Sequence, residues 1–327
     1  MRFAPRFFVR GAFMDSRERF YAAINHREPD RVPHIALLYQ QLVDGLNAEL
    51  EGADYRDHYG EDIRLIGVDY PEYQTIKFKD NIFPLPSKKA LEKARCEIDS
   101  VKERGLVSCN TYIPGIFEHF KAFTDDEFAL YHMMAEPKEA KVFIGRIADW
   151  LCRLFELYAK TGYDICFNGD DIGTQNSTIM GMHSYREFYK QNHKKLLDSI
   201  KSANPEAVAA FHCCGHMHTI LPEWIEIGVD MVHSVQPEAN DLKYLKSEFG
   251  DKIAFWGALG LQSEMYYLSI GQMDEAMREC INTMAPGGGF VAGTSNYVTG
   301  EVPLEKIKLM YEAIKKYGIY PSLGTTR

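Results

Sequence analysis

AAFHCCGH, at residues 209–216, is a short apolar run that ends in metal-binding residue types and a glycine. Because side chains alternate between the two faces of a strand, His212 and Cys214 are expected on one face and Cys213 on the other. His212 and Cys214 would then leave the end of a strand together, as an imidazole and thiolate pair of the kind that zinc binds. Gly215 allows the backbone to turn sharply just beyond them.

Strand-like and helix-like segments alternate on both sides of this stretch. Strands are expected at residues 32–38, 63–68, 106–109, 164–168, 208–213, 228–232, 253–257 and 290–293. Amphipathic helices are expected between many of them, the longest at residues 138–160. Strands that alternate with helices predict a parallel sheet built from βαβ units, and eight of them predict an α/β fold of the (β/α)8 TIM barrel type.

The sequence contains no internal repeats and no Gly/Ser-rich linkers. We therefore predict one barrel domain over residues 14–327. Asp15 and Glu18 have the spacing of an N-terminal capping box, so a helix is expected directly after an N-terminal extension at residues 1–13. The charged segment at residues 87–104 has no clear hydrophobic period. We interpret it as a solvated face or a hairpin.

The composition excludes several classes of protein. The chain has 327 residues with 46% hydrophobic residues and a net charge of -9, and it lacks a dense Lys/Arg block, so no nucleic-acid partner is expected. Seven scattered cysteines do not indicate a secreted disulfide framework, which favours a reducing, cytoplasmic location. No apolar run is long enough to span a bilayer, so no membrane association is expected.

Polar and aromatic residues follow the predicted strands at their carboxyl ends, where barrel enzymes hold their active sites. They are Asp170 and Asp171 after the fourth strand, His212 and Cys214 at the fifth, His233 and Gln236 after the sixth, Trp256 on the seventh, and Asn296 and Tyr297 after the eighth. We interpret His212 and Cys214 as metal ligands. Catalytic roles are expected for Asp170, Asp171 and His233. Substrate contacts are expected from Gln236, Trp256, Asn296 and Tyr297.

Two of these assignments have structural alternatives. Asp170 and Asp171 could cap the turn after their strand, because aspartate is favoured in turns. His212 could be a hydrogen-bonded histidine at a packed strand end, with Cys214 as a small buried hydrophobe.

Five segments of the sequence carry a family resemblance. They read SRERF at residues 16–20, NHREPDRVP at 25–33, GDDIGTQ at 169–175, FHCCG at 211–215 and VPLEKI at 302–307. As a set these segments resemble the uroporphyrinogen decarboxylase superfamily, and the resemblance extends over residues 14–318. It implies the same (β/α)8 barrel.

The segment after the first predicted strand distinguishes two branches of that superfamily. Porphyrinogen decarboxylases carry an arginine-rich segment there that holds substrate carboxylates, whereas residues 37–41 read LLYQQ, without an arginine. The pair of His212 and Cys214 instead resembles the metal motif of the corrinoid-linked methyltransferases. Zinc enzymes of that branch add a cysteine near the eighth strand, where this chain has Ser295, and often an acidic residue after the sixth, where it has Gln236.

The resemblance therefore implies zinc at His212 and Cys214. Candidates for a further ligand are Asp170, Asp171, His233 and Glu238. The implied reaction moves a methyl group between a small molecule, either an aryl methyl ether or a thiol, and the cobalt of a corrinoid (cobalamin) carried by a separate protein. A homodimer is a possible assembly. The alternatives are a decarboxylase of a smaller acidic substrate and a barrel retained as a binding module.

Overall fold

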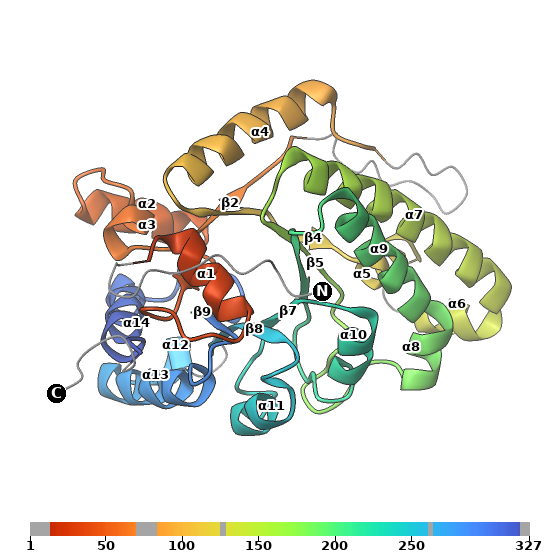
Figure 1. The fold of residues 1–327 in the computed structure, drawn as a ribbon. Helices are drawn as coiled ribbons and strands as arrows, with labels where there is room; N and C mark the ends of the chain where they lie inside the picture. Colours follow the sequence, from red (N-terminus) through yellow and green to blue (C-terminus); the bar gives the residue numbers. More distant parts are fainter. Residues whose placement is uncertain (1–13, 70–83, 125–128, 261–263, 321–327) are drawn as a thin grey trace. The chain divides into compact units, whose positions relative to one another are not determined.

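Parallel strands alternate with helices along the chain, as expected for a (β/α)8 barrel, and this predicted fold class is confirmed (Figure 1). The computed structural model describes residues 14–69, 84–124, 129–260 and 264–320, so the predicted extension at residues 1–13 lies outside the described residues. The strands are β1 (His34–Ile35), β2 (Ile63–Ile66), β3 (Val107–Asn110), β4 (Ile113–Pro114), β5 (Ile165–Gly169), β6 (Val208–His212), β7 (Met231–Ser234), β8 (Ala254–Leu259) and β9 (Phe290–Thr294). All eight predicted strands are present, and β4 is a short addition.

The helices follow the same alternation. They are α1 (Ser16–Ile24), α2 (Gln40–Glu49), α3 (Tyr55–Tyr59), α4 (Lys88–Glu103), α5 (Ile116–Thr124), α6 (Ala129–Ala135), α7 (Pro137–Thr161), α8 (Met182–Phe188), α9 (Lys190–Ala203), α10 (Leu221–Ile227), α11 (Leu242–Phe249), α12 (Glu264–Tyr267), α13 (Ile270–Met284) and α14 (Leu304–Tyr317). The capping box predicted from Asp15 and Glu18 is present at the start of α1. In the described residues, no helix is both long enough and apolar enough to cross a membrane.

The chain forms two compact units. Unit 1 contains residues 1–64, 105–107 and 231–327, and its parallel strands lie in the order β1, β9, β8, β7. Unit 2 contains residues 65–104 and 108–230, and in it β5 pairs in parallel with β4 and β6. The strands of both units have buried side chains, which explains why their sequences read as continuous apolar runs.

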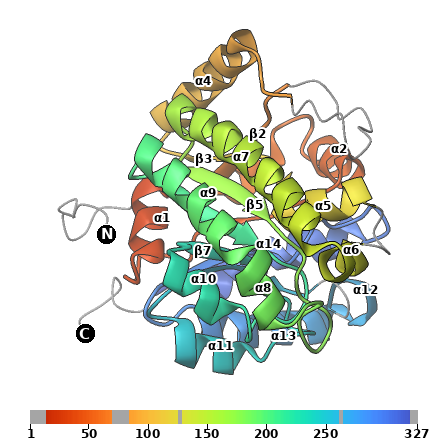
Figure 2. The same ribbon diagram turned by 90° about the vertical axis from the view of Figure 1, so that its right-hand side faces the viewer.

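The longest helix, α7, shows how the sequence directs packing in unit 2. Its residues Phe143, Ile147, Leu151 and Phe155 recur every four positions and are all buried, so they form one apolar stripe. The helix begins with Pro137 in its first turn and ends at Gly162, whose φ of 106° is in the left-handed region that favours glycine. Figures 1 and 2 show α7 lying beside α9, with which it packs.

The charged segment at residues 87–104 forms the helix α4 with most of its side chains in solvent, so the predicted solvated face is confirmed and the alternative of a hairpin is wrong. Ser87 caps this helix by accepting a hydrogen bond from the Ala90 N–H at 3.2 Å. Its buried residues are Ala94 and Ile98, which are one turn apart. The helical period is therefore present in the sequence, but the two buried residues are hard to recognise among the surrounding charged residues.

Candidate metal centre

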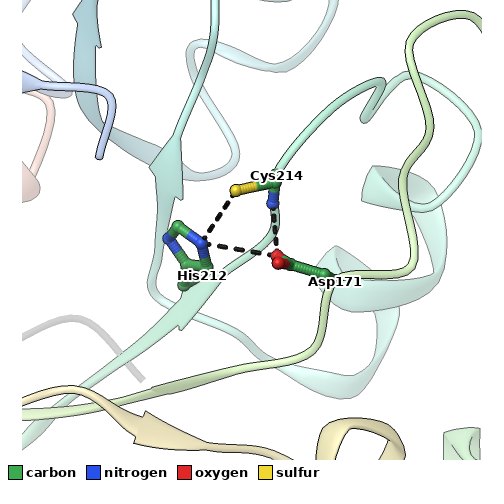
Figure 3. Close-up of side chains that lie close together, drawn as sticks. All are labelled: Asp171, His212 and Cys214. Carbon is green, nitrogen blue, oxygen red and sulfur yellow. Dashed lines mark hydrogen bonds and ion pairs between the residues drawn. The ribbon is translucent and has the colours of Figure 1, made fainter. Parts of the chain in front are cut away.

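Three side chains that could bind a metal ion come together in unit 2 (Figure 3). The His212 Nε2 atom lies 3.3 Å from the Cys214 Sγ atom and 3.4 Å from the Asp171 Oδ1 atom. All three potential ligand atoms lie within 4.8 Å of one another. The structure therefore adds a carboxylate to the imidazole and thiol that the sequence singled out.

The pairing of β5 with β6 places these groups at one level of the sheet. Gly169, the last residue of β5, lies opposite His212, the last residue of β6. A Cβ atom on Gly169 would lie 2.1 Å from the His212 carbonyl oxygen, so only glycine fits at this point. Asp171 and Cys214 each follow their strand by two residues, which brings both beside His212.

The loops that follow the two strands are joined by hydrogen bonds that backbone N–H groups donate. The Gly173 N–H donates to the Cys213 Sγ atom at 3.3 Å, and the His216 N–H donates to the Thr174 carbonyl at 2.8 Å. Gly215 has a φ of 81°, and a Cβ atom there would lie 2.4 Å from the Thr174 oxygen. These contacts hold the loop that carries Asp171 against the loop that carries Cys214.

The carboxylate of Asp171 is stabilised in its ionised form. Burial by itself would raise its pKa, but the hydrogen bond to His212 and the positive charge of that ring when protonated lower it. The backbone N–H of Cys214 donates to Oδ1 at 2.7 Å and acts in the same direction, so the pKa of Asp171 falls to about 2. Asp171 therefore provides an anionic oxygen at neutral pH.

The imidazole of His212 is enclosed on one side by aromatic rings. The Tyr112 ring lies 5.1 Å from it and the Phe167 ring 6.3 Å, both edge-on. The Tyr112 hydroxyl donates to the Gly169 carbonyl at 2.9 Å, which fixes the phenol beside the centre. Tyr112 was not predicted, although it lies just beyond the third predicted strand and the strand-end rule points to such positions.

Asp170 has a different environment from Asp171. Its Oδ2 atom lies 2.8 Å from the His193 Nε2 atom, and its Oδ1 atom accepts the Glu118 N–H at 2.9 Å. The Asp170 side chain is only 2% exposed. Of the two neighbouring aspartates, the structure places Asp171 with His212 and Cys214, and it places Asp170 against α5 and α9.

The remaining predicted residues lie in unit 1. His233 and Trp256 are opposite each other on β7 and β8, and their rings are 4.5 Å apart. The His233 Nε2–H donates to the Thr294 carbonyl at 3.1 Å. Backbone strain lies close by, because Val235 and Ala258 have φ values of 54° and 67°.

The other three predicted substrate residues lie on loops of unit 1. The Gln236 carbonyl accepts a hydrogen bond from Asn240 at 2.9 Å. The Asn296 side chain accepts the Tyr297 N–H at 2.7 Å, and the Tyr297 ring lies 5.6 Å from that of Tyr39. Their roles in substrate binding stay predictions.

These features define a (β/α)8 barrel with a candidate metal centre at the carboxyl ends of β5 and β6. The chain belongs to the uroporphyrinogen decarboxylase (URO-D) family, whose model matches residues 122–317, more than half of its length. The family resemblance inferred from the sequence segments is thereby confirmed.

Solved structures support the same fold. A methyltransferase from Methanosarcina mazei has a TM-score of 0.69 at 15% identity, covering 93% of this chain and 99% of that one. A B12-independent methionine synthase from Shewanella sp. W3-18-1 has a TM-score of 0.52 at 13% identity, covering 88% and 95%. At such identities the similarity establishes the fold alone. No curated protein matches the sequence.

Proposed function

We propose that this protein is a zinc-assisted, corrinoid-dependent methyltransferase. It would move a methyl group between a small molecule and the cobalt of a corrinoid bound to a separate protein. The observation that carries this proposal is the convergence of Asp171, His212 and Cys214 at the strand ends of a URO-D-family barrel. The structural similarity to a Methanosarcina mazei methyltransferase supports the choice of a methyltransferase over a decarboxylase.

The distances from the His212 nitrogen to the other two donor atoms fit a zinc ion. Zinc bonds of about 2.0–2.3 Å at tetrahedral angles place neighbouring ligand atoms about 3.3–3.8 Å apart. The His212 Nε2 atom lies 3.3 Å from the Cys214 sulfur and 3.4 Å from the Asp171 oxygen, which agrees with that spacing. A set of one nitrogen, one sulfur and one oxygen leaves a fourth position for substrate, as in catalytic zinc sites.

Zinc, when bound, would supply a Lewis acid that stabilises a phenolate leaving group or a substrate thiolate. The protein's contribution is to hold the three ligands and to limit access of water. Asp171 provides a negative charge at neutral pH because its pKa is about 2. Tyr112 and Phe167 cover one side of His212 with apolar surface, while the Asp171 side chain is 36% exposed and leaves another side open.

We propose that the substrate is an aryl methyl ether. A carboxylate donates less charge to zinc than a second thiolate would, so the centre favours stabilisation of a leaving oxygen. In this direction the methyl carbon–oxygen bond breaks with its electron pair on oxygen, and cobalt(I) provides the pair for the new carbon–cobalt bond. The phenolate then takes a proton from solvent. His233, Gln236, Trp256, Asn296 and Tyr297 are the proposed catalytic and substrate-binding residues of unit 1.

The test is methyl transfer to free cob(I)alamin, which stands in for the corrinoid of the partner protein. The purified chain is mixed with a methoxylated phenol and cob(I)alamin, and formation of methylcobalamin is followed by absorbance. We expect methylcobalamin and one equivalent of demethylated phenol only when chain, phenol and cob(I)alamin are all present. Demethylation without any cobalamin would contradict the proposal. Release of carbon dioxide from an acidic substrate would favour the decarboxylase instead.

A further inference from the structure

A chain of buried hydrogen bonds runs through unit 2 next to the candidate metal centre. The Tyr185 hydroxyl lies 3.1 Å from the His193 Nδ1 atom, and the His193 Nε2 atom lies 2.8 Å from the Asp170 Oδ2 atom. The side chains of His193 and Asp170 are each 2% exposed. With its proton on Nε2, the neutral His193 ring donates to the carboxylate and accepts from the tyrosine, so one tautomer satisfies both partners.

The second oxygen of Asp170 is also held. Oδ1 accepts the Glu118 N–H at 2.9 Å in the first turn of α5. Gly115 precedes this helix, and a Cβ atom there would lie 2.5 Å from Oδ1, so the glycine makes room for the carboxylate. Asp170 therefore connects the start of α5 with His193 on α9. A buried carboxylate with both oxygens bonded is held firmly in position.

The backbone of Asp170 connects this network to the metal ligands. Its N–H donates to the His212 carbonyl at 3.0 Å, and its own carbonyl accepts the Ile172 N–H at 2.8 Å. Asp171 is the next residue in the chain, so its position depends on that backbone. The ring of His193 also packs edge-on against Phe211, directly before His212, at 5.5 Å.

We propose that His193 is a positioning residue for the metal centre. It acts through Asp170, whose side chain it fixes and whose backbone sets the positions of Asp171 and His212. The inference rests on the proposed zinc function and assigns His193 a role that is additional to the three ligands. Such outer partners typically change metal affinity by about 10–100-fold when they are removed.

The test compares zinc affinity in His193→Leu and His193→Gln by competition with a chromogenic chelator. A leucine side chain is similar in volume to histidine but makes neither hydrogen bond, so we expect about 10–100-fold weaker zinc binding. Glutamine can still donate to Asp170 from a similar position, so we expect it to restore most of the affinity. Tyr185→Phe, which loses only one hydroxyl, should bind zinc with intermediate affinity and serves if the leucine variant does not fold.

Ser108→Ala is the matched control. The Ser108 hydroxyl donates to the buried Asp164 carboxylate at 2.8 Å, just before β5, whereas Asp170 comes just after it. This variant should lower the melting temperature without changing zinc affinity.

Two results would contradict the inference, and they have different consequences for the proposed function. Equal zinc affinity in the unsubstituted protein, His193→Leu and Tyr185→Phe would overturn the positioning role and leave the zinc site intact. No zinc binding by the unsubstituted protein would overturn the proposed function together with this inference.

Discussion

Replacing Cys214 with alanine is expected to weaken zinc binding by more than about 100-fold, since even partners beyond the ligands contribute about 10–100-fold. The variant loses the thiolate and leaves only His212 and Asp171, which lie 3.4 Å apart. Methyl transfer to cob(I)alamin should fall to the background rate, because the proposed Lewis acid is then missing. Zinc content after dialysis and the rate of methylcobalamin formation measure the two effects.

Cys152→Ala provides the control for this experiment. Cys152 is a buried cysteine of α7 in the same unit and contributes to packing. It should keep zinc and activity while losing some stability. A Cys214→Ala protein that retains one zinc per chain and full activity would contradict the assignment of Cys214 as a ligand.

Asp62→Asn is expected to reduce the free energy of unfolding by about 3–5 kcal/mol, the usual cost of removing one partner from a buried ion pair. The Asp62 carboxylate is fully buried. It lies 2.6 Å from the Arg19 Nη1 atom and 2.8 Å from the Arg31 Nη1 atom, and it accepts the His34 N–H at 2.9 Å. Urea unfolding, followed by circular dichroism, measures the change.

The difference in stability between Asp62→Asn and the unsubstituted protein should depend on pH. Burial by itself would raise the pKa of Asp62, but Arg31, His34 and Arg19 lower it below its usual value. Because the pKa of Asp62 is lower in the folded protein than in the unfolded chain, the Asp62 carboxylate stabilises the fold fully above the unfolded-state pKa of about 3.9. This stabilisation is lost as the pH falls through the folded-state pKa of Asp62. The difference between Asp62→Asn and the unsubstituted protein should therefore shrink below about pH 4.

Asp54→Asn is the matched control in unit 1. Asp54 pairs with Arg56 at 2.7 Å, but both side chains are about one-third exposed. Such a surface pair contributes about 0–1 kcal/mol. Equal losses of unfolding free energy in Asp62→Asn and Asp54→Asn would contradict a stabilising role for the buried ion pairs of Asp62.

Much of the fold could be predicted because strand ends and helix caps are local signals. The capping box of Asp15 and Glu18 needs only the spacing within one turn, and it is present. The pair of His212 and Cys214 followed from alternation along one strand, and the structure places these two side chains 3.3 Å apart. Eight apolar runs separated by helices were enough to predict the barrel.

The rest of the site depends on contacts between distant parts of the chain. Asp170 and Asp171 look equivalent in sequence, and only the pairing of β5 with β6 and the packing of α9 distinguish them. No local pattern connects His193 with Asp170, which is 23 residues away. Arg19 and Arg31 lie in segments that suggested the family, yet in the structure they stabilise Asp62 in the core.

Zinc K-edge X-ray absorption on the zinc-loaded protein tests the central claim most directly. Coordination by Asp171, His212 and Cys214 predicts one sulfur ligand at about 2.3 Å and otherwise nitrogen or oxygen ligands at about 2.0–2.2 Å. In Cys214→Ala the sulfur contribution should disappear. A protein that binds no zinc, or a zinc ion with no sulfur ligand or with two, would contradict the proposed centre.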